Sequence, residues 1–219
     1  MPLVGVLLSG CGLFDGSEIH ESVLTLYFLK KHNADYMCIA PNIEQYHVIN
    51  HFTQEVTGEK RNVLVESARI ARGEIKDLSE IKADMIDALI LPGGFGAAKN
   101  LSDFALKGDQ AQVHPEVKRL LREMVEQKKP IGAICIAPAT VVKALEGFNP
   151  EVTIGTDLNT AQMIQRMGGK HFECTVDKVH VDKNLRIVTT PAYMLGPTIF
   201  DVGKGIENLV LEVLNLIGK

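Results

Sequence analysis

Short apolar runs recur along the chain and contain almost no polar residue. They are bounded by glycine, proline or aspartate, and they cover Leu3–Leu8, Tyr36–Ala40, Ala88–Leu91 and Ile131–Cys135. Runs of this length that do not alternate with polar residues are typical of strands buried on both faces of a sheet.

Longer stretches between these runs show the periodicity of amphipathic helices. They cover Ser17–His32, Pro115–Gln127, Pro138–Leu145, Leu158–Met167 and Pro197–Ile217. Strands that alternate with helices in this way predict an α/β protein with a parallel sheet covered by helices on both sides.

Two further segments have a different pattern. Val176–Val181 and Leu185–Thr189 are joined by turn residues, Asp182-Lys183-Asn184, which predicts an antiparallel hairpin added to the sheet.

The stretch Pro41–Asp87 has the weakest pattern. It predicts two weak strands, Tyr46–Phe52 and Asn62–Glu66, and one helix opened by the capping box Asp77-Leu-Ser-Glu80. Because no repeat, low-complexity tract or linker interrupts the chain, we expect a single domain over residues 1–219.

Composition narrows the class of protein. The chain has 219 residues, 46% hydrophobic and 23% charged, which fits a globular domain with a sizeable core. The net charge of -4, without a concentration of lysine and arginine, argues against nucleic acid or anionic lipid as the main partner.

The chain start and the cysteines indicate the compartment. The start lacks the charged region of a signal peptide, and no apolar run approaches the ~20 residues of a membrane span, so we expect a soluble, cytoplasmic protein with no membrane partner. Cys11, Cys38, Cys135 and Cys174 have no metal-type spacing, so we expect free thiols and no metal site.

Cys135 is the first candidate for chemistry, because ligands of open parallel sheets bind beyond the carboxyl ends of the strands. Small residues, Ala133 and Ala137, flank it as a nucleophile elbow requires. The helix after it would favour the thiolate through its amides and dipole. A buried structural cysteine is the alternative interpretation.

Two more segments that follow strands at the same edge of the sheet add candidate groups. Gly93-Gly94 comes directly after a central strand and could supply oxyanion amides, although a plain tight turn is the alternative. Asp15 and Glu18 fit a capping box, which favours a structural role for both. Glu21 lies deeper in the first helix, where burial would raise its pKa and allow proton exchange with a bound carbonyl.

Two motifs favour structural roles. Gly10, Gly12 and Gly16 nearly match a dinucleotide fingerprint, but the spacing is one residue too long and no acid comes after the second strand. We therefore expect no nicotinamide cofactor. His114-Pro115-Glu116 resembles an amidotransferase triad motif but fits a helix start with proline at its first position.

Three motifs together carry a family resemblance: A-I-C-I-A-P around Cys135, L-I-L-P-G-G-F-G around Gly93, and E-S-V-L from Glu21. The sequence resembles the DJ-1/PfpI group of the class I glutamine amidotransferase-like superfamily, in particular its ElbB/ES1 branch of isoprenoid biosynthesis proteins with an amidotransferase-like domain. The resemblance implies a flavodoxin-like three-layer sandwich, an elbow cysteine at Cys135, a helix-borne acid at Glu21 and a homodimer.

The resemblance also implies glutathione-independent glyoxalase chemistry, a lyase activity, or related deglycation. Cys135 would attack the aldehyde of glyoxal or methylglyoxal, and Glu21 would shuttle the proton that leads to a 2-hydroxy acid. The substrate and oxyanion would be bound at Gly93, Gly94 and Ile136, with no metal or organic cofactor.

Departures from the family pattern keep two alternatives open. Protease-like members have histidine where this chain has Ile136, and Val152–Gly155 lacks the histidine of DJ-1-like members. A cysteine–histidine triad is therefore not expected. The alternatives are a thiol-based sensor or regulatory binding module, in which Cys135 is oxidised or engages a metabolite, and a glutaminase-type hydrolase.

Overall fold

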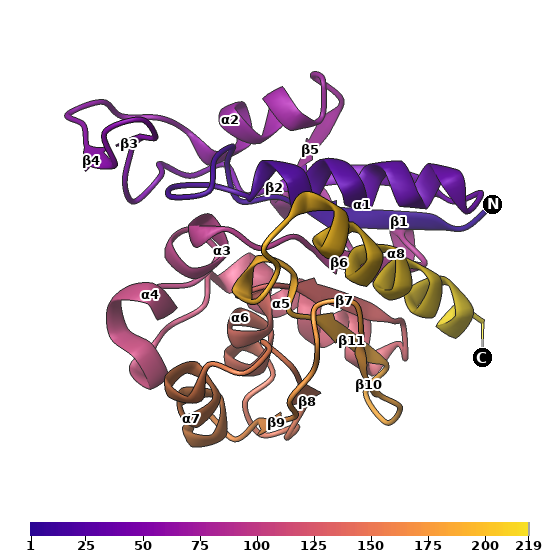
Figure 1. The fold of residues 1–219 in the computed structure, drawn as a ribbon. Helices are drawn as coiled ribbons and strands as arrows, with labels where there is room; N and C mark the ends of the chain where they lie inside the picture. Colours follow the sequence, from indigo (N-terminus) through magenta and orange to yellow (C-terminus); the bar gives the residue numbers. More distant parts are fainter. Residues whose placement is uncertain (219) are drawn as a thin grey trace.

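A seven-stranded sheet runs through the centre of the computed structural model, which describes residues 1–218 (Figure 1). All neighbouring strands are parallel except β10 and β11. The α/β class, with a mostly parallel sheet and an added antiparallel hairpin, is therefore confirmed. In order across the sheet, the strands are β10 (His180–Asp182), β11 (Ile187–Thr190), β7 (Ile131–Ile134), β6 (Ala88–Leu91), β1 (Leu3–Leu7), β2 (Asp35–Ala40) and β5 (Ile75–Asp77).

Helices cover both faces of the sheet and complete the flavodoxin-like three-layer sandwich. On one face lie α1 (Ile19–Lys31), α2 (Val63–Ile70) and α8 (Ile199–Leu216). On the other lie α3 (Phe95–Lys99), α5 (Pro115–Glu126), α6 (Ala137–Ala144) and α7 (Leu158–Arg166). Each layer of helices closes its own hydrophobic core against the sheet.

The two cores explain why the central strands are apolar throughout. In β6, Ala88 and Ile90 contact one core, whereas Leu89 and Leu91 contact the other, and all four are fully buried. Because successive side chains of a strand point to opposite faces, a strand covered on both sides has no place for polar residues. The unalternated pattern therefore predicted the sheet correctly.

The strand order reverses its direction between β1 and β6. From β1 the chain builds outward to β2 and β5, and then it returns to β6 and continues to β7 and β11 on the other side. Ligands of such sheets bind beyond the carboxyl ends of the strands, where the order reverses. The residues directly after β1, β6 and β7 therefore meet at one edge.

The segment between β2 and β5 differs from its predicted structure. Asn62–Glu66 was expected as a strand but opens helix α2, with the Asn62 side chain accepting from the amide of Val65 at 3.1 Å. Val63, Glu66 and Ser67 are buried on one helical face. The cap and this burial outweigh the strand propensity of Val63 and Val65.

Two other expectations in this segment were wrong in extent. The strand predicted over Tyr46–Phe52 contains only β3 (Ile49–Asn50), which pairs with β4 (Glu55–Val56). Figure 1 shows these strands in a lobe at the left. The helix predicted from Asp77 is a single 3-10 turn, η1 (Leu78–Glu80), because the chain returns to an extended conformation at Ile81.

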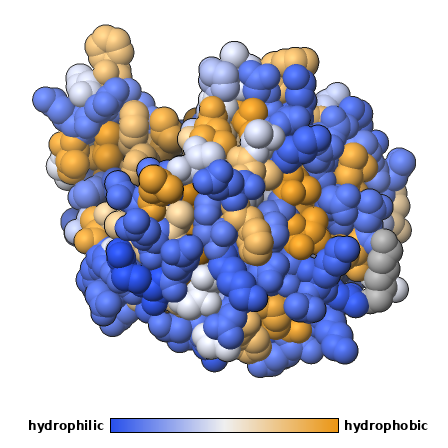
Figure 2. Space-filling view, turned by 60° about the horizontal axis from the view of Figure 1, so that its bottom comes forward, coloured by the Kyte–Doolittle hydropathy of each residue, from blue (hydrophilic) through white to orange (hydrophobic). Residues whose placement is uncertain are grey.

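The predicted hairpin is confirmed, but its first strand is shorter than the predicted Val176–Val181. Only His180–Asp182 pair with β11, and Asp182, which was predicted in the turn, belongs to the strand. Hydrophilic side chains dominate the face in Figure 2, and hydrophobic residues form separate groups there. The remaining elements are η2 (Ala83–Met85), α4 (Phe104–Lys107), η3 (Gly108–Gln110), β8 (Glu151–Val152), β9 (Lys170–His171) and η4 (Ala192–Met194).

Asp182 fixes the turn of this hairpin. Its buried carboxylate accepts from the amides of Asn184 at 2.9 Å, Leu185 at 3.0 Å and Glu151 at 2.9 Å. Asp182→Ala leaves three amides without this acceptor, so we expect the free energy of unfolding to fall by about 2 kcal/mol in urea titrations. Lys183→Ala, in the same turn but exposed, should change it by less than about 0.5 kcal/mol. Equal losses would contradict this role of Asp182.

Candidate active site

Cys135 occupies a strained turn between β7 and α6. Its φ of 60° lies in the left-handed region, where residues other than glycine are uncommon. The turn is held by the amide of Cys135, which donates to the carbonyl of Thr190 at 3.0 Å, and Ala133 and Ala137 are fully buried beside it. This is the geometry of a nucleophile elbow, and the Cys135 side chain itself is nearly buried.

Glu21 lies against this cysteine. Its side chain is fully buried and forms a hydrogen bond with the Cys135 thiol. The amide of Gly93 donates to Oε2 of Glu21 at 2.8 Å, and the amide of Tyr193 donates to Oε1 at 3.4 Å. The structure therefore brings together the two residues that were predicted as nucleophile and acid.

Glu18 sets the position of Glu21. As the N-cap of α1, it accepts from the amide of Glu21 at 2.7 Å, while its own amide donates to the carbonyl of Gly93 at 3.0 Å. The second of these bonds joins the start of α1 to the segment that directly follows β6. Glu21 thus lies in the first helical turn, closer to the helix start than the sequence suggested.

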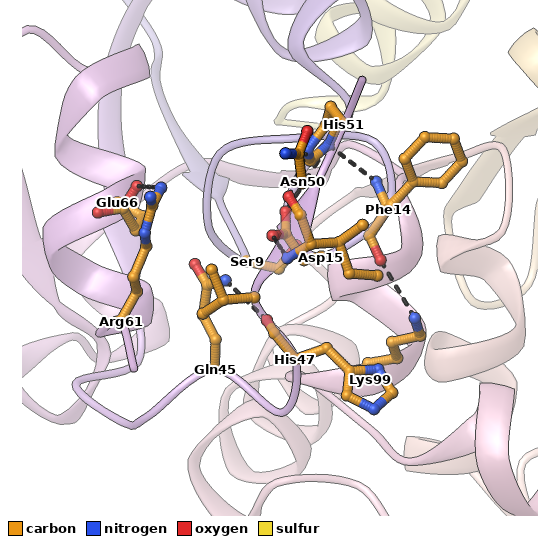
Figure 3. Close-up of polar contacts among 12 residues, drawn as sticks. Ser9, Phe14, Asp15, Gln45, His47, Asn50, His51, Arg61, Glu66 and Lys99 are labelled. Atoms are coloured by element: carbon orange, nitrogen blue, oxygen red, sulfur yellow. Dashed lines mark hydrogen bonds and ion pairs between the residues drawn. The ribbon is translucent and has the colours of Figure 1, made fainter. Parts of the chain in front are cut away.

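The predicted partnership of Asp15 and Glu18 in a capping box was wrong. Asp15 is buried away from the helix, and its Oδ2 accepts from the amide of Ile49 at 2.8 Å. Nearby, Nε2 of His51 accepts from the amide of Phe14 at 3.2 Å (Figure 3). Asp15 therefore holds the loop after β1 to the lobe with β3 and β4, a role that local spacing does not reveal.

Both predicted glycines are required by close approach of the backbone. A Cβ on Gly93 would lie 2.5 Å from Cβ of Cys135 and 2.7 Å from Oε2 of Glu21. A Cβ on Gly94, which has a φ of 90°, would lie 2.4 Å from the amide nitrogen of Glu18. The glycines are therefore more than a tight turn, because they let three elements meet at the sulfur.

Gly94→Ala should lower the free energy of unfolding by about 3 kcal/mol, since it adds a backbone clash to a strained φ. Gly147→Ala is the matched control, because Gly147 has a φ of 97° but a Cβ added there would meet nothing within 4 Å. We expect the control to lose only about 1 kcal/mol. Urea unfolding of both variants measures the difference, and equal losses would show that the clash at Gly94 is unimportant.

Two backbone amides point at the sulfur of Cys135. They belong to Gly94 and Ile136, which both donate hydrogen bonds to it. Amides in this position can stabilise negative charge that develops on a bound carbonyl oxygen. The predicted oxyanion residues therefore surround the predicted nucleophile.

Burial controls the protonation of the pair. It raises the pKa of Glu21 to about 8, with a further increase from the charge of Glu18, although the amides of Gly93 and Tyr193 oppose the shift. Burial, followed by the charge of Glu21, also raises the pKa of the Cys135 thiol. The amides of Gly94 and Ile136 lower it, as expected, but desolvation outweighs them. The predicted effect of the helix amides therefore has the expected direction, but burial is the larger influence on this thiol.

Tyr193 is a site residue that the sequence motifs did not reveal. It lies after β11 at the same sheet edge, in η4, and its hydroxyl lies 2.7 Å from Nδ1 of His20. Pro191, which follows β11, could have indicated this part of the site in the sequence. Because β11 pairs with β7, the residues after β11 lie beside Cys135, which follows β7.

His114 has the structural role that was expected. Its Nδ1 accepts from the amide of Glu116 at 3.3 Å, and Pro115 begins α5. Among residues 1–218, no group of three or more histidine, cysteine, aspartate or glutamate side chains is arranged to hold a metal ion. The four cysteines are unpaired, and burial raises the pKa of Cys38 to about 11.

The fold and the site define an amidotransferase-like α/β protein with an elbow cysteine. Residues 12–195 match the model of the DJ-1/PfpI family, and the chain belongs to that family. The solved structure of an isoprenoid biosynthesis protein with an amidotransferase-like domain, from Ehrlichia chaffeensis, is 42% identical, with a TM-score of 0.90. The match covers 97% of this chain and 99% of that one, which confirms the predicted branch and fold.

Two mammalian proteins are similarly related. Human "Glutamine amidotransferase-like class 1 domain-containing protein 3, mitochondrial" is 46% identical, and rat "ES1 protein homolog, mitochondrial" is 44% identical. Each match covers 99% of this chain and 84% of the relative. In the part of the chain that the structure describes, no helix has both the length and the apolar character of a membrane span.

Proposed function

We propose that this protein is a glutathione-independent glyoxalase that converts glyoxal to glycolate and methylglyoxal to lactate, with deglycation as a related activity. The observation that carries the proposal is the hydrogen-bonded pair of Cys135 and Glu21, buried beside the amides of Gly94 and Ile136. The raised pKa of Glu21 supplies a carboxyl group that can both give and take a proton near neutral pH.

Addition to the aldehyde is the first step. The sulfur of Cys135 forms a bond to the aldehyde carbon, and the aldehyde oxygen takes a proton from Glu21 while the thiol proton passes to the other oxygen of Glu21. The product is a hemithioacetal. The amides of Gly94 and Ile136 stabilise the negative charge that develops on the oxygen.

Isomerisation and release complete the reaction. Glu21 then releases one proton to the solvent, and the resulting carboxylate takes the proton from the carbon that carries sulfur and returns it to the neighbouring carbon, while the hydroxyl proton moves to the neighbouring oxygen. This gives the thioester of a 2-hydroxy acid without any net redox change. Water then cleaves the carbon–sulfur bond, which releases the acid and restores the Cys135 thiol.

The direct test is product formation from glyoxal in the absence of glutathione. We expect one glycolate for each glyoxal consumed, measured by NMR with isotopically labelled glyoxal. Loss of glyoxal without glycolate would mean adduct formation on surface side chains and would contradict the proposal. Release of ammonia from glutamine would support the glutaminase-type alternative instead.

The sensor alternative has less support from the site. Redox-sensing cysteines are commonly exposed and have a lowered pKa. Cys135 is nearly buried, and burial raises its pKa. Oxidation of Cys135 at low peroxide concentrations, without aldehyde turnover, would reverse this preference.

The oligomeric state and the cellular compartment are two further parts of the proposal. We propose a homodimer, which light scattering tests as a particle of twice the chain mass. The cytoplasmic location is tested by microscopy of the tagged protein in its own cell, where a mitochondrial signal, as the names of the mammalian relatives suggest, would contradict it.

A further inference from the structure

An apolar pocket lies next to the cysteine, between α3, α4, α7 and the start of α6. Its volume is about 380 Å³, within the range of small-molecule sites. Glyoxal has only two carbon atoms and would leave most of this space unfilled. The walls include Phe95, Phe104, Leu106, Ile136, Thr160 and Met163.

Two residues of the pocket wall are linked to the amides at the sulfur. Ile136 lines it and donates its amide to the sulfur of Cys135. Phe95, also in the wall, comes directly after Gly94, which donates the second amide. A carbonyl group bound at these amides would therefore have its substituent beside the pocket.

The lining selects for apolar groups. No lining residue is charged, and Thr160 carries the one polar side chain among them. Phe95 and Leu106 are 43% and 42% exposed, so their apolar surfaces are available to a ligand. Apolar pockets of enzymes can distinguish ligands that differ by one methylene by about 10-fold or more.

We propose that this pocket is the subsite for the substituent of the aldehyde, and that the preferred substrates are 2-oxoaldehydes with an alkyl or aryl group. This inference rests on the proposed function for its substrate class. The pocket itself can be tested independently of turnover by alkylation of the Cys135 thiol.

Two alkylating reagents with the same reactive carbon provide that test: iodoacetamide and N-benzyliodoacetamide. Each forms a carbon–sulfur bond and releases iodide, and peptide mass mapping gives the rate at every cysteine. Cys174, which is partly exposed, reports the intrinsic ratio of the two reagents. We expect Cys135 to favour the benzyl reagent at least about 10-fold more than Cys174 does.

Met163→Glu should abolish this preference, because it places a carboxylate in the apolar pocket. Gln162→Glu is the matched control, since it adds the same charge on the exposed face of α7. Ala105→Trp, which fills the pocket from an exposed position, tests the same idea if Met163→Glu does not fold. With aldehydes, Met163→Glu should lower kcat/KM for phenylglyoxal at least about 10-fold more than it lowers kcat/KM for glyoxal.

The outcomes separate the pocket from the proposed function. An equal benzyl preference at Cys135 and Cys174, or a preference that survives both Met163→Glu and Ala105→Trp, would overturn the subsite even if glyoxal is converted. A pocket-dependent preference in a protein that converts no aldehyde would support the subsite and reject the glyoxalase proposal.

Discussion

Cys135→Ala should reduce the conversion of glyoxal to glycolate by at least about 1,000-fold, to the level without protein. The reason is that the substitution removes the only group in the proposed mechanism that bonds to the aldehyde carbon. Glu21 and the amides of Gly94 and Ile136 could still polarise a bound carbonyl, but they form no covalent intermediate. Initial rates of glycolate formation, without glutathione, measure the effect.

Cys11→Ala is the matched control for this substitution. Cys11 is partly exposed, lies after β1 at the same edge of the sheet, and is likewise a free thiol. We expect Cys11→Ala to keep the wild-type rate within about two-fold, because Cys11 takes no part in the proposed steps. If Cys135→Ala keeps a tenth of the wild-type rate or more, Cys135 is not the nucleophile.

The central sheet could be predicted because the burial of each strand is visible in the residue types of that strand alone. The four residues of β6 are buried in two different cores, so every position must be apolar. The uninterrupted apolar run of these residues therefore indicates a strand that is covered on both faces. Gly93 and Cys135 could then be selected as candidates because they follow the carboxyl ends of two such strands, where ligands of parallel sheets bind.

The segment between β2 and β5 could not be predicted in this way. Val63 and Val65 favour a strand by their local propensity. The helix is stabilised instead by the cap from Asn62 and by the contacts of α2 with the sheet. The role of Asp15 was mispredicted for a related reason. Its spacing from Glu18 suits a cap, but its actual partner, Ile49, is distant in the chain.

The candidate site shows the same limit. Residue types and their places after strands indicated Cys135, Glu21 and Gly93, but not the neighbour that completes them. Tyr193 donates to Glu21 across 172 positions of sequence, and no short motif encodes such a contact. The raised pKa of Cys135 was also not predicted, since the degree of burial is a tertiary property that outweighs the amides of a short helix.

The stability of Glu21→Gln relative to the wild type should increase as the pH rises. Burial raises the pKa of Glu21 from its ordinary value of 4.5 to about 8 in the folded protein. Between these values the unfolded chain has lost the proton and the folded protein retains it, so the free energy of unfolding of the wild type falls as the pH increases. Glutamine mimics the neutral carboxyl and does not ionise.

The difference in the free energy of unfolding between Glu21→Gln and wild type should therefore grow by about 3 kcal/mol from pH 5 to pH 8. Urea titrations at several pH values measure it, and other ionisable groups cancel in the difference. Glu126→Gln, at an exposed position of α5, should give a curve parallel to that of the wild type. A constant difference for Glu21→Gln would mean that Glu21 ionises as readily in the folded protein as in the unfolded chain.

The same substitution should lower glyoxal turnover by at least about 100-fold, because glutamine cannot carry the proton between the two carbons of the adduct. The carbon–sulfur bond can still form, so mass spectrometry should detect the glyoxal adduct on Cys135 in Glu21→Gln while glycolate formation fails. Gain of stability together with loss of turnover is the pattern of a residue held in an unfavourable environment for its chemistry. If Glu21→Gln gains stability and keeps full turnover, the buried carboxyl is not the proton shuttle.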